Sequence, residues 1–369
     1  MSSAEVVLGF LEDAEPWRLR SPQFPSKVGG KPAWLSQRGL PSLPGLECEI
    51  CRLPMVFLLQ VYAPISGQDR SFHRTLFLFC CKTPECYTRN DSRCMKVFRN
   101  QLQRRNEFYP YDPPPEDEPP CDADEGQSVL SISGVKLCWV CGCPGNKACS
   151  RCHTVTYCGK HHQTLHWKQS HKKECCSQEG SPVTPSPLLF PETELVTEPE
   201  EEEKDVKEAE GEQEEEDGGG IITQRSVDCP ALAECKVKAL AESDLDEMAM
   251  HETEDSKVFQ RFKKKIAPEP HQVIRYSRGG SPLWVSSQHI PSDEDIPPCT
   301  CGAKRTFEFQ VMPQLLNSLS VDSTGASIDW GTAAVYTCSA SCERSDQYCP
   351  EVIWKQDFSS DQHTQTERR

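Results

Sequence analysis

Cysteine and histidine are the residues whose spacing most clearly indicates chemistry in this chain. The 369-residue sequence holds 22 cysteines and 10 histidines, and between residues 138 and 175 they recur in close pairs. Thiolate and imidazole groups three or four positions apart reach one ion from a knuckle or a helical turn, and eight of them satisfy two tetrahedral Zn²⁺ ions. The block therefore predicts two zinc sites. Its eight ligands are Cys138, Cys141, Cys149, Cys152, Cys158, His162, His171 and Cys175.

Two more cysteine sets belong to an internal repeat. The string Gly-Gly-x-Pro-x-Trp-aliphatic begins at Gly29 and again at Gly279, and further matches follow in order, such as Gln60 with Gln310, at an offset of 250 (310 − 60). Each copy contains four cysteines in matching order, which predicts one tetrahedral zinc site per copy. The first set is Cys48, Cys51, Cys81 and Cys86, and the second is Cys299, Cys301, Cys338 and Cys342.

Adjacent Cys80 and Cys81 compete for one ligand position in the first copy. The repeat distinguishes them, because residues 79–81 align with residues 336–338, which read Tyr-Thr-Cys. Cys81 matches a cysteine of the second copy and Cys80 matches a threonine, so we expect Cys81 to be the ligand. The same alignment places Val97-Phe98-Arg99 against Ile353-Trp354-Lys355.

Each predicted site is closed, since four protein ligands leave no position for water or substrate. Catalytic zinc keeps such a position, so we expect these ions to stabilise small units that lack the core to fold alone. The sequence also shows no recognisable arrangement of nucleophile, base and orienting group, and we do not expect an enzyme. The Gly-Gly strings lack the glycine spacing and the Lys-Ser/Thr of a phosphate-binding loop; a sharp turn that places a tryptophan on the sheet is the simpler interpretation.

Charge is distributed very unevenly along the chain. The net charge is −16, but residues 192–217 hold 15 Asp/Glu and two Lys and so account for −13 of it. A run of like charges repels itself and buries little, which predicts disorder. No apolar signal segment or long apolar run is present, and paired cysteines indicate metal binding in a reducing compartment. These features predict a soluble cytoplasmic or nuclear zinc protein that does not enter a membrane.

The elements that must position these ligands are short strands. Segments of strand length with alternating or continuous apolar residues occur at Val56–Tyr62, Thr75–Cys80 and Lys96–Arg99, and again at Arg305–Val311, Ala333–Cys338 and Glu351–Lys355. Residues 232–266 have a helical pattern, with Val258, Phe259, Phe262 and Ile266 on one stripe and Pro268 as the stop.

The predicted fold class is α+β, mainly β. Two duplicated zinc-bearing β units pack as one composite domain, because each alone buries too little surface, and a zinc finger and a disordered acidic linker are inserted between them. The expected order is a first repeat at 1–110, a Pro/acidic linker at 111–134, a finger at 135–176, a disordered Pro/acidic linker at 177–227, a helical segment at 228–268, a second repeat at 269–358 and a disordered tail at 359–369.

The spacing within residues 138–175 resembles the MYND zinc finger. That resemblance implies two interleaved sites, Cys138, Cys141, Cys158 and His162 for one ion and Cys149, Cys152, His171 and Cys175 for the other. The family usually has a cysteine where His162 stands; imidazole binds zinc equally well, although His161 is an alternative. We expect Cys143 and Cys176 not to bind metal.

The MYND resemblance also implies a peptide groove that Gln163 and Trp167 help to line. MYND grooves bind Pro-x-Leu-x-Pro peptides, and this chain contains Pro187-Leu188-Leu189-Phe190-Pro191. We hypothesise that this segment occupies its own finger. The finger is also basic, with seven Lys and Arg and no acid between Lys136 and Lys173. Direct nucleic-acid binding is nevertheless not expected, because no recognition helix is apparent.

Longer strings along the whole chain resemble the programmed cell death protein 2 family. They are residues 17–20, 24–30, 32–35, 97–102, 272–276, 309–316 and 328–331, together with the finger. The resemblance implies a cytoplasmic and nuclear chaperone that captures a newly made small-subunit ribosomal protein of the universal S-five family and supports small-subunit biogenesis. It also implies links to cell death, proliferation and transcriptional corepressors.

A binding role fits the charge of the chain. A basic ribosomal protein needs a partner that covers its charged and apolar surface before assembly, and we expect a cleft between the two β halves, near the acidic run, to provide it. The alternatives are a corepressor adaptor acting through the MYND groove, a DNA-binding regulator and, from the cross-braced finger, a ubiquitin ligase.

Overall fold

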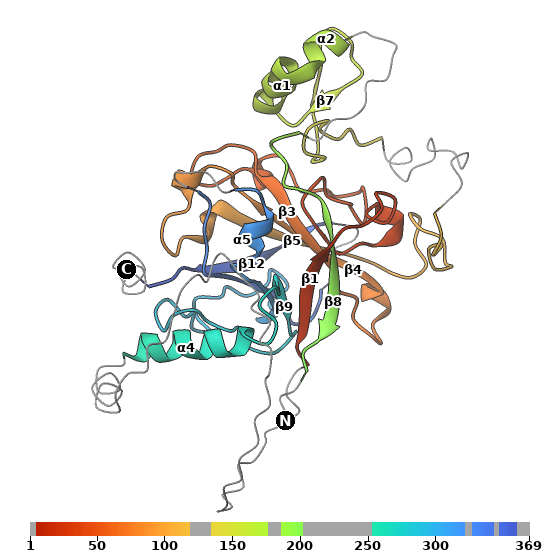
Figure 1. Cartoon of the computed structure of the whole chain (residues 1–369). Coiled ribbons are helices and arrows are strands. Elements are labelled where there is room, and N and C mark those ends of the chain that lie inside the picture. Colours follow the sequence, from red (N-terminus) through yellow and green to blue (C-terminus); the bar gives the residue numbers. More distant parts are fainter. Residues whose placement is uncertain are drawn as a thin grey trace, which may run out of the picture.

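The computed structural model describes residues 5–118, 134–175, 186–201, 253–321, 327–342 and 347–359. Its centre is a closed antiparallel barrel in the order β1-β8-β2-β3-β4-β5-β12-β11-β10-β9, with the finger on one side and helix α4 on the other (Figure 1). The strands are β1 (Val7–Glu12), β2 (Lys27–Val28), β3 (Val56–Tyr62), β4 (His73–Cys80), β5 (Met95–Leu102), β8 (Thr193–Pro199), β9 (Ile274–Tyr276), β10 (Arg305–Val311), β11 (Thr332–Cys338) and β12 (Cys349–Gln356).

All six predicted strands are present, and the prediction of a mainly β fold with two duplicated units is confirmed. Strands β3 and β10 have the predicted bounds, and the other four extend by one to four residues. Each repeat contributes four consecutive strands, β2 to β5 and β9 to β12. Residues of β4 are buried along its whole length, as expected for a strand with packed neighbours on both sides.

The two repeats share local details that the sequence repeat implied. Both β3 and β10 contain a bulge, at Leu58 and Glu308 respectively. The glutamine two positions later clamps the Gly-Gly loop in each copy: Gln60 accepts from the backbone N–H of Ala33 at 2.9 Å, and Gln310 accepts from that of Leu283 at 2.6 Å. These buried amides satisfy loop backbone groups that water cannot reach, which explains why the glutamine recurs.

The repeats join edge to edge through β5 and β12. The register pairs Arg99 with Cys349 and Val97 with Glu351. Inside the barrel, Arg74 of β4 donates to Glu308 of β10, with one N–H···O distance of 2.6 Å, and both side chains are fully buried. Burial alone would raise the pKa of Glu308, but the charge of Arg74 and hydrogen bonds from Arg74 and Thr337 outweigh it and hold this pKa below 4.5.

Strands β1 and β8 close the other side of the barrel. They pair over six residues, from Val7 with Pro199 to Glu12 with Glu194, and lie side by side in Figure 1. Strand β8 then pairs with β2 and β1 with β9. The prediction that all of residues 177–227 form a disordered linker is therefore wrong for residues 193–199. These residues form strand β8, in which the side chain of Leu195 is buried.

The expected cleft between two β halves is also absent from the described residues. The halves pair directly through β5 and β12 on one side and are bridged by β1 and β8 on the other, and the barrel interior is filled by buried side chains such as Arg74, Glu308 and Thr337. Two lobes around an open groove would need at least one unpaired edge; here β1 and β8 occupy that edge.

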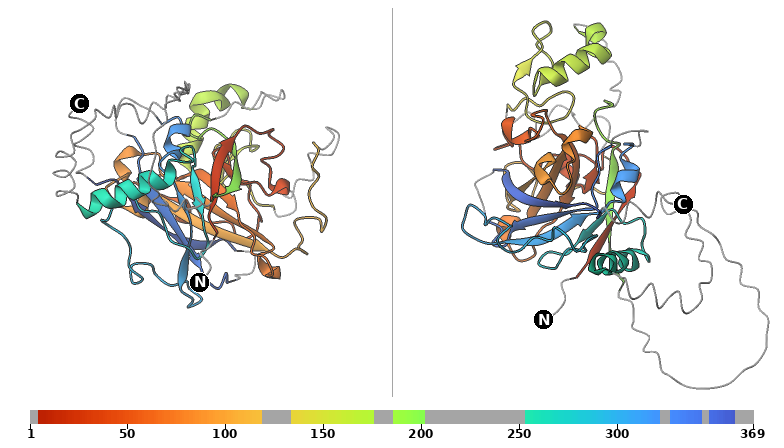
Figure 2. Two further views of the ribbon diagram at one scale, coloured as in Figure 1. Left: turned by 60° about the horizontal axis from the view of Figure 1, so that its bottom comes forward. Right: turned by 90° about the vertical axis from the view of Figure 1, so that its left-hand side faces the viewer.

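Helix α4 (Glu254–Ile266) confirms the C-terminal part of the predicted helix, and residues 232–252 lie outside the described part of the chain. Thr253 caps the helix by accepting from Ser256 N–H at 3.2 Å. Phe262 packs with Val285 and Met312 of the second repeat, with Phe259 and Ile266 beside it. The helix therefore covers the second repeat, as both views in Figure 2 show.

The remaining segments connect these elements. A short helix, α5 (Leu315–Ser318), follows β10. Residues 111–118 run along the first repeat, where Gln23 donates to the carbonyl oxygen of Pro115. Ser359, expected to begin a disordered tail, is buried and donates to Asp255. Residues 134, 186–192 and 200–201 of the predicted linkers also belong to the described part of the chain, and the rest of the predicted linker and tail residues lie outside it. Within those ranges, no helix is both long and apolar enough to cross a membrane.

The buried ion pair gives the first testable prediction. Arg74→Met leaves the Glu308 carboxylate buried without its partner, which typically costs about 3–5 kcal/mol, so we expect a markedly lower urea midpoint at pH 7. Because the pKa of Glu308 is lowered, its contribution is present above pH 4.5 and is lost as the pH falls through the folded-state value. Urea unfolding at pH 7 and at pH 4 measures both effects.

Two controls accompany it. The double variant Arg74→Met/Glu308→Leu removes both charges and should regain much of the lost stability. Lys304→Ala breaks an exposed pair with Asp293 and should leave the midpoint unchanged. An Arg74→Met chain as stable as the parent would contradict the assigned role of this pair.

Candidate metal centres

Four groups of cysteine and histidine side chains gather in the described structure, and they are the four sets that the sequence predicted. Within each group the ligand atoms all lie within 4.8 Å of one another. The groups are Cys48, Cys51, Cys81 and Cys86; Cys138, Cys141, Cys158 and His162; Cys149, Cys152, His171 and Cys175; and Cys299, Cys301, Cys338 and Cys342.

The spacing within the groups fits tetrahedral zinc. With Zn–S near 2.3 Å, two thiolates at tetrahedral positions lie about 3.8 Å apart. The sulfur atoms of Cys51 and Cys81 are 3.6 Å apart, those of Cys301 and Cys338 3.6 Å, and those of Cys149 and Cys175 3.9 Å. A disulfide would need about 2.05 Å. These donor sets and distances support zinc binding.

The first repeat builds its group from two hairpin-like knuckles. Cys48 and Cys51 lie in a turn closed by the bridge between Glu47 and Pro54, and Cys81 directly follows β4. Cys86 ends the short helical turn Pro84–Cys86. Cys81 is thus positioned directly by a barrel strand, and the other three ligands by the turns before β3 and after β4.

Cys80 points into the barrel core instead. It is fully buried, and burial raises the pKa of its thiol to about 12, so it remains a neutral apolar side chain. Cys94 behaves in the same way, with its pKa raised to about 12 by burial. The structure thus gathers Cys81 with the other three ligands and leaves Cys80 out of the group.

The finger is a compact ligand framework with little other structure. Its strands β6 (Lys147–Ala148) and β7 (Thr156–Tyr157) pair, and helix α1 (Lys160–His166) continues through a π-helical turn, Trp167–His171, into α2 (Lys172–Glu174). The helices present His162 and His171 to different groups. His162 approaches Cys158 through Nδ1 at 3.0 Å, whereas His171 approaches Cys152 through Nε2 at 3.5 Å.

The structure separates ligand candidates that the sequence left open. His162 is buried in its group, whereas His161 is exposed. Cys143 is buried beside the first finger group and donates to the carbonyl oxygen of Cys141 at 3.8 Å. Cys176 lies outside the described residues.

The finger packs on the Gly-Gly-x-Pro-x-Trp loop of the first repeat. Trp34 lies over Phe77 of the sheet, with ring centroids 5.1 Å apart, and its indole N–H donates to the carbonyl oxygen of Gly142 at 2.8 Å. Lys31 lies 5.5 Å from the ring of the exposed Trp139. The expected turn that places a tryptophan on the sheet is therefore present, and it also holds the finger.

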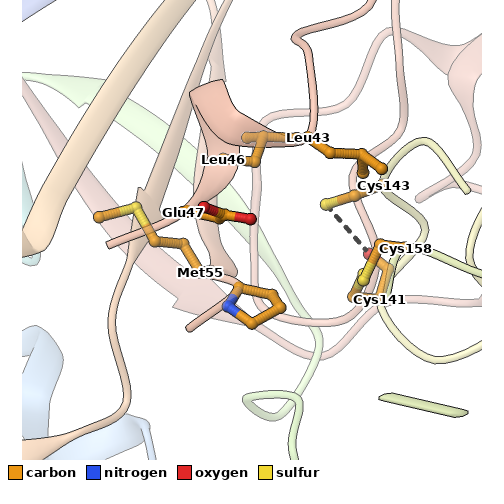
Figure 3. Close-up of a pocket in the computed structure, with 8 residues that line it drawn as sticks. Leu43, Leu46, Glu47, Met55, Cys141, Cys143 and Cys158 are labelled. Atoms are coloured by element: carbon orange, nitrogen blue, oxygen red, sulfur yellow. Dashed lines mark hydrogen bonds between the residues drawn. The ribbon is translucent and has the colours of Figure 1, made fainter. Parts of the chain in front are cut away.

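A small pocket marks the same interface (Figure 3). Leu43, Leu46, Glu47, Pro54 and Met55 of the first repeat line one side, and Cys141, Cys143 and Cys158 of the finger line the other. Two of these residues, Cys141 and Cys158, belong to one ligand group of the finger, so that group lies against the first repeat.

The hypothesis that residues 187–191 occupy their own finger groove is not supported by their contacts, which are with the first repeat. Phe190 is buried, Lys82 lies 4.6 Å from its ring, and Lys82 also donates to the carbonyl oxygen of Pro187. Gln163 and Trp167 are half-buried on the finger. Strand β8 explains this position. The N-terminal end of β8 pairs with β2 of the first repeat, so the segment directly before β8 must lie on that repeat.

That contact explains the paired glycines of the first copy. Gly29 and Gly30 have φ angles of 67° and 65°, and a Cβ at Gly29 would lie 1.8 Å from the carbonyl oxygen of Pro191. Gly30 N–H donates to the carbonyl oxygen of Phe190 at 3.0 Å. Glycine is required because the segment crosses directly over a left-handed turn; the paired glycines were the signal for this contact.

Comparison with known proteins agrees with this organisation. Three family models match: Programmed cell death protein 2, N-terminal domain, over residues 5–116; MYND finger, over 138–175; and Programmed cell death protein 2, C-terminal putative domain, over 256–357. Programmed cell death protein 2 of Bos taurus is 48% identical over 361 residues, or 97% of this chain and 98% of the relative. The chain belongs to the programmed cell death protein 2 family.

More distant matches extend the family. Programmed cell death protein 2-like of Mus musculus is 30% identical over 348 residues, 88% of this chain and 87% of the relative. Probable 20S rRNA accumulation protein 4 of Schizosaccharomyces pombe is 35% identical over 97 residues, 23% of this chain and 24% of the relative. No solved structure gives a significant match. Neither the family descriptions nor these names denote an enzyme.

Adjacent cysteines provide a matched test of the metal groups in this family member. Cys81→Ser removes one of four ligands and should lower the zinc content of the purified chain by one ion. Cys80→Ser changes a core thiol and should leave the zinc content unchanged, although it places a hydroxyl in the core. Metal analysis of both proteins by mass spectrometry distinguishes them; loss of zinc from Cys80→Ser with full zinc in Cys81→Ser would reverse the assignment.

Proposed function

We propose that this chain is a zinc-stabilised binding protein that captures a newly made small-subunit ribosomal protein of the universal S-five family and so supports small-subunit biogenesis. Family membership carries the proposal. Its support includes the name of the fission-yeast relative, which associates that protein with 20S rRNA accumulation. The names of the more similar relatives refer to cell death and do not specify a client.

The four ligand groups favour binding over catalysis. Each offers four protein ligands, so a zinc ion in it would be saturated and would act on the stability of the unit around it. Two would hold the finger together and one each would fix the knuckles at the ends of β4 and β11. In this proposal the metal shapes a binding surface and takes no part in a reaction.

Charge indicates how a basic client would be recognised. The acidic run begins in and beside strand β8 of the barrel, where Glu192 pairs with Lys27, Glu194 with Arg18 and Glu200 with Arg275. Those acids are already neutralised by the protein. The ten acids among residues 202–217 are offset by two lysines. We propose that their negative charge attracts the basic client. An acidic segment of this composition attracts a cationic partner over about a Debye length.

Binding of purified small-subunit ribosomal protein of this family to the full chain tests the proposal. The parent should bind, and a variant with the ten acids of 202–217 changed to Gln or Asn should associate at least about 10-fold more slowly at low salt, since rim charges act mainly on association. A control variant neutralises the exposed acids Asp293, Glu294 and Asp295 and should bind like the parent.

The outcomes separate the parts of the proposal. No binding by the parent overturns the client. Binding that is equal for the parent and the linker variant overturns the assigned role of the acidic run. Retention of corepressor peptides by the finger, with no ribosomal protein bound, would favour the adaptor alternative instead.

A further inference from the structure

The last ligand of the second repeat's zinc group, Cys342, lies in a turn that the first repeat holds. This turn, Ala340–Cys342, follows β11, and Ser341 adopts a left-handed conformation with φ of 45°. Such a conformation is strained for a residue other than glycine and persists only where surrounding contacts fix it. The contacts that fix it come from strands and loops more than two hundred residues away in the sequence.

Arg99 of β5 makes the most direct of these contacts. Its guanidinium is almost fully buried and donates to the carbonyl oxygen of Cys342 at 3.1 Å and toward the sulfur of Cys342 at 3.7 Å. Its Nε donates to Glu351 of β12 at 2.7 Å. Glu351 in turn accepts from the backbone N–H of Cys338 at 3.2 Å. One buried ion pair thus contacts two ligands of the group.

Three further residues of the first repeat hold the same turn. Ser341 donates to Gln101 at 2.5 Å, and its hydroxyl lies 3.4 Å from that of Ser71. Arg70 donates to the carbonyl oxygen of Ala340 at 3.2 Å. The turn is therefore positioned from two elements, β5 and the helical turn before β4.

The second repeat makes the reciprocal contact. Lys355, which the sequence repeat aligns with Arg99, is fully buried and donates to the carbonyl oxygen of Thr88, two residues after the ligand Cys86. Asp357 accepts from the backbone N–H of Asn90 at 2.6 Å. Each repeat thus places a buried cation from its last strand against the loop that carries the other repeat's fourth ligand.

We propose that Arg99 is a positioning residue for the zinc group of the second repeat, and Lys355 for that of the first, so that each metal site is complete only when the two halves of the barrel are joined. A four-cysteine zinc site carries a net charge of −2. A guanidinium that donates to one of its sulfurs offsets part of that charge and orients the ligand, the role that residues around metal ligands commonly have. The inference is independent of the client that the protein binds.

Thiol labelling measured site by site tests this proposal in the full zinc-loaded chain. We expect Arg99→Met to raise the rate at which N-ethylmaleimide, in the presence of EDTA, modifies Cys301 and Cys342. Loss of residues that orient metal ligands typically lowers metal affinity by about 10- to 100-fold, and labelling should accelerate by a similar factor. Peptide mass spectrometry reads the same experiment at Cys51 and Cys86 of the first group, where the increase should be several-fold smaller.

Lys355→Met is the matched variant and should show the reverse preference, with faster labelling at Cys51 and Cys86. Cys80, fully buried and outside every group, reports general unfolding and should stay unlabelled in both. Equal acceleration at both groups in both variants, or an unchanged rate at Cys301 in Arg99→Met, would overturn the proposal.

A milder variant covers the case in which Arg99→Met also exposes Cys80. Gln101→Ala removes the contacts with Ser341 and the hydrogen bond that Arg99 donates to Gln101, and leaves the ion pair between Arg99 and Glu351 in place. It should accelerate labelling at Cys301 and Cys342 with Cys80 still protected; a rate equal to that of the parent would count against the cross-repeat support.

Discussion

The antiparallel contact between β5 and β12 is the interaction on which the rest of this structure depends. It is short, yet buried charges converge on it: Glu351 of β12 accepts from Arg99 of β5 and from Arg305 of β10. Of the donors to this carboxylate, Arg99 alone comes from the first repeat, whereas Arg305 and the backbone N–H of Cys338 belong to the second. Separation of the halves would break the buried Arg99–Glu351 ion pair and the hydrogen bonds between β5 and β12, so the pairing makes the barrel one unit.

This constraint explains how so small a repeat can be stable. Each copy supplies four duplicated strands, a ligand group and one cation for the other copy, while β1 and β8, which are not duplicated, close the remaining edges. The finger is attached at one repeat and helix α4 at the other, on loops that correspond in sequence. The duplicated loop has therefore diverged in its contacts while its clamp by Gln60 or Gln310 has been kept.

The sequence was most informative where local chemistry decides structure. Ligand spacing and the repeat predicted all four groups, including Cys81 over Cys80, and apolar runs predicted six strands. It failed where long-range pairing decides. Strand β8 has only Leu195 and Val196 as apolar residues between glutamates, so its sequence is like that of a polar linker. Only its pairing with β1 and β2 in the folded protein makes it a strand. Because β8 pairs with β2, the segment Pro187–Pro191 lies against the first repeat. Together with β1, the same strand closes the side of the barrel where a cleft was expected. The cross-repeat contacts of Arg99 and Lys355 have no local signal, because each cation stands in an ordinary strand.

Whether the two repeats form one cooperative unit is the central claim, and pulsed thiol labelling across a urea titration tests it most directly. Cys80 lies in the core of the first repeat and Cys349 is buried in the second, and neither belongs to a ligand group. If the two repeats unfold as one unit, both thiols become reactive at the same urea concentration and with the same steepness, as in two-state unfolding. Labelling of one thiol at clearly lower urea than the other would show that the halves unfold separately and would contradict that claim.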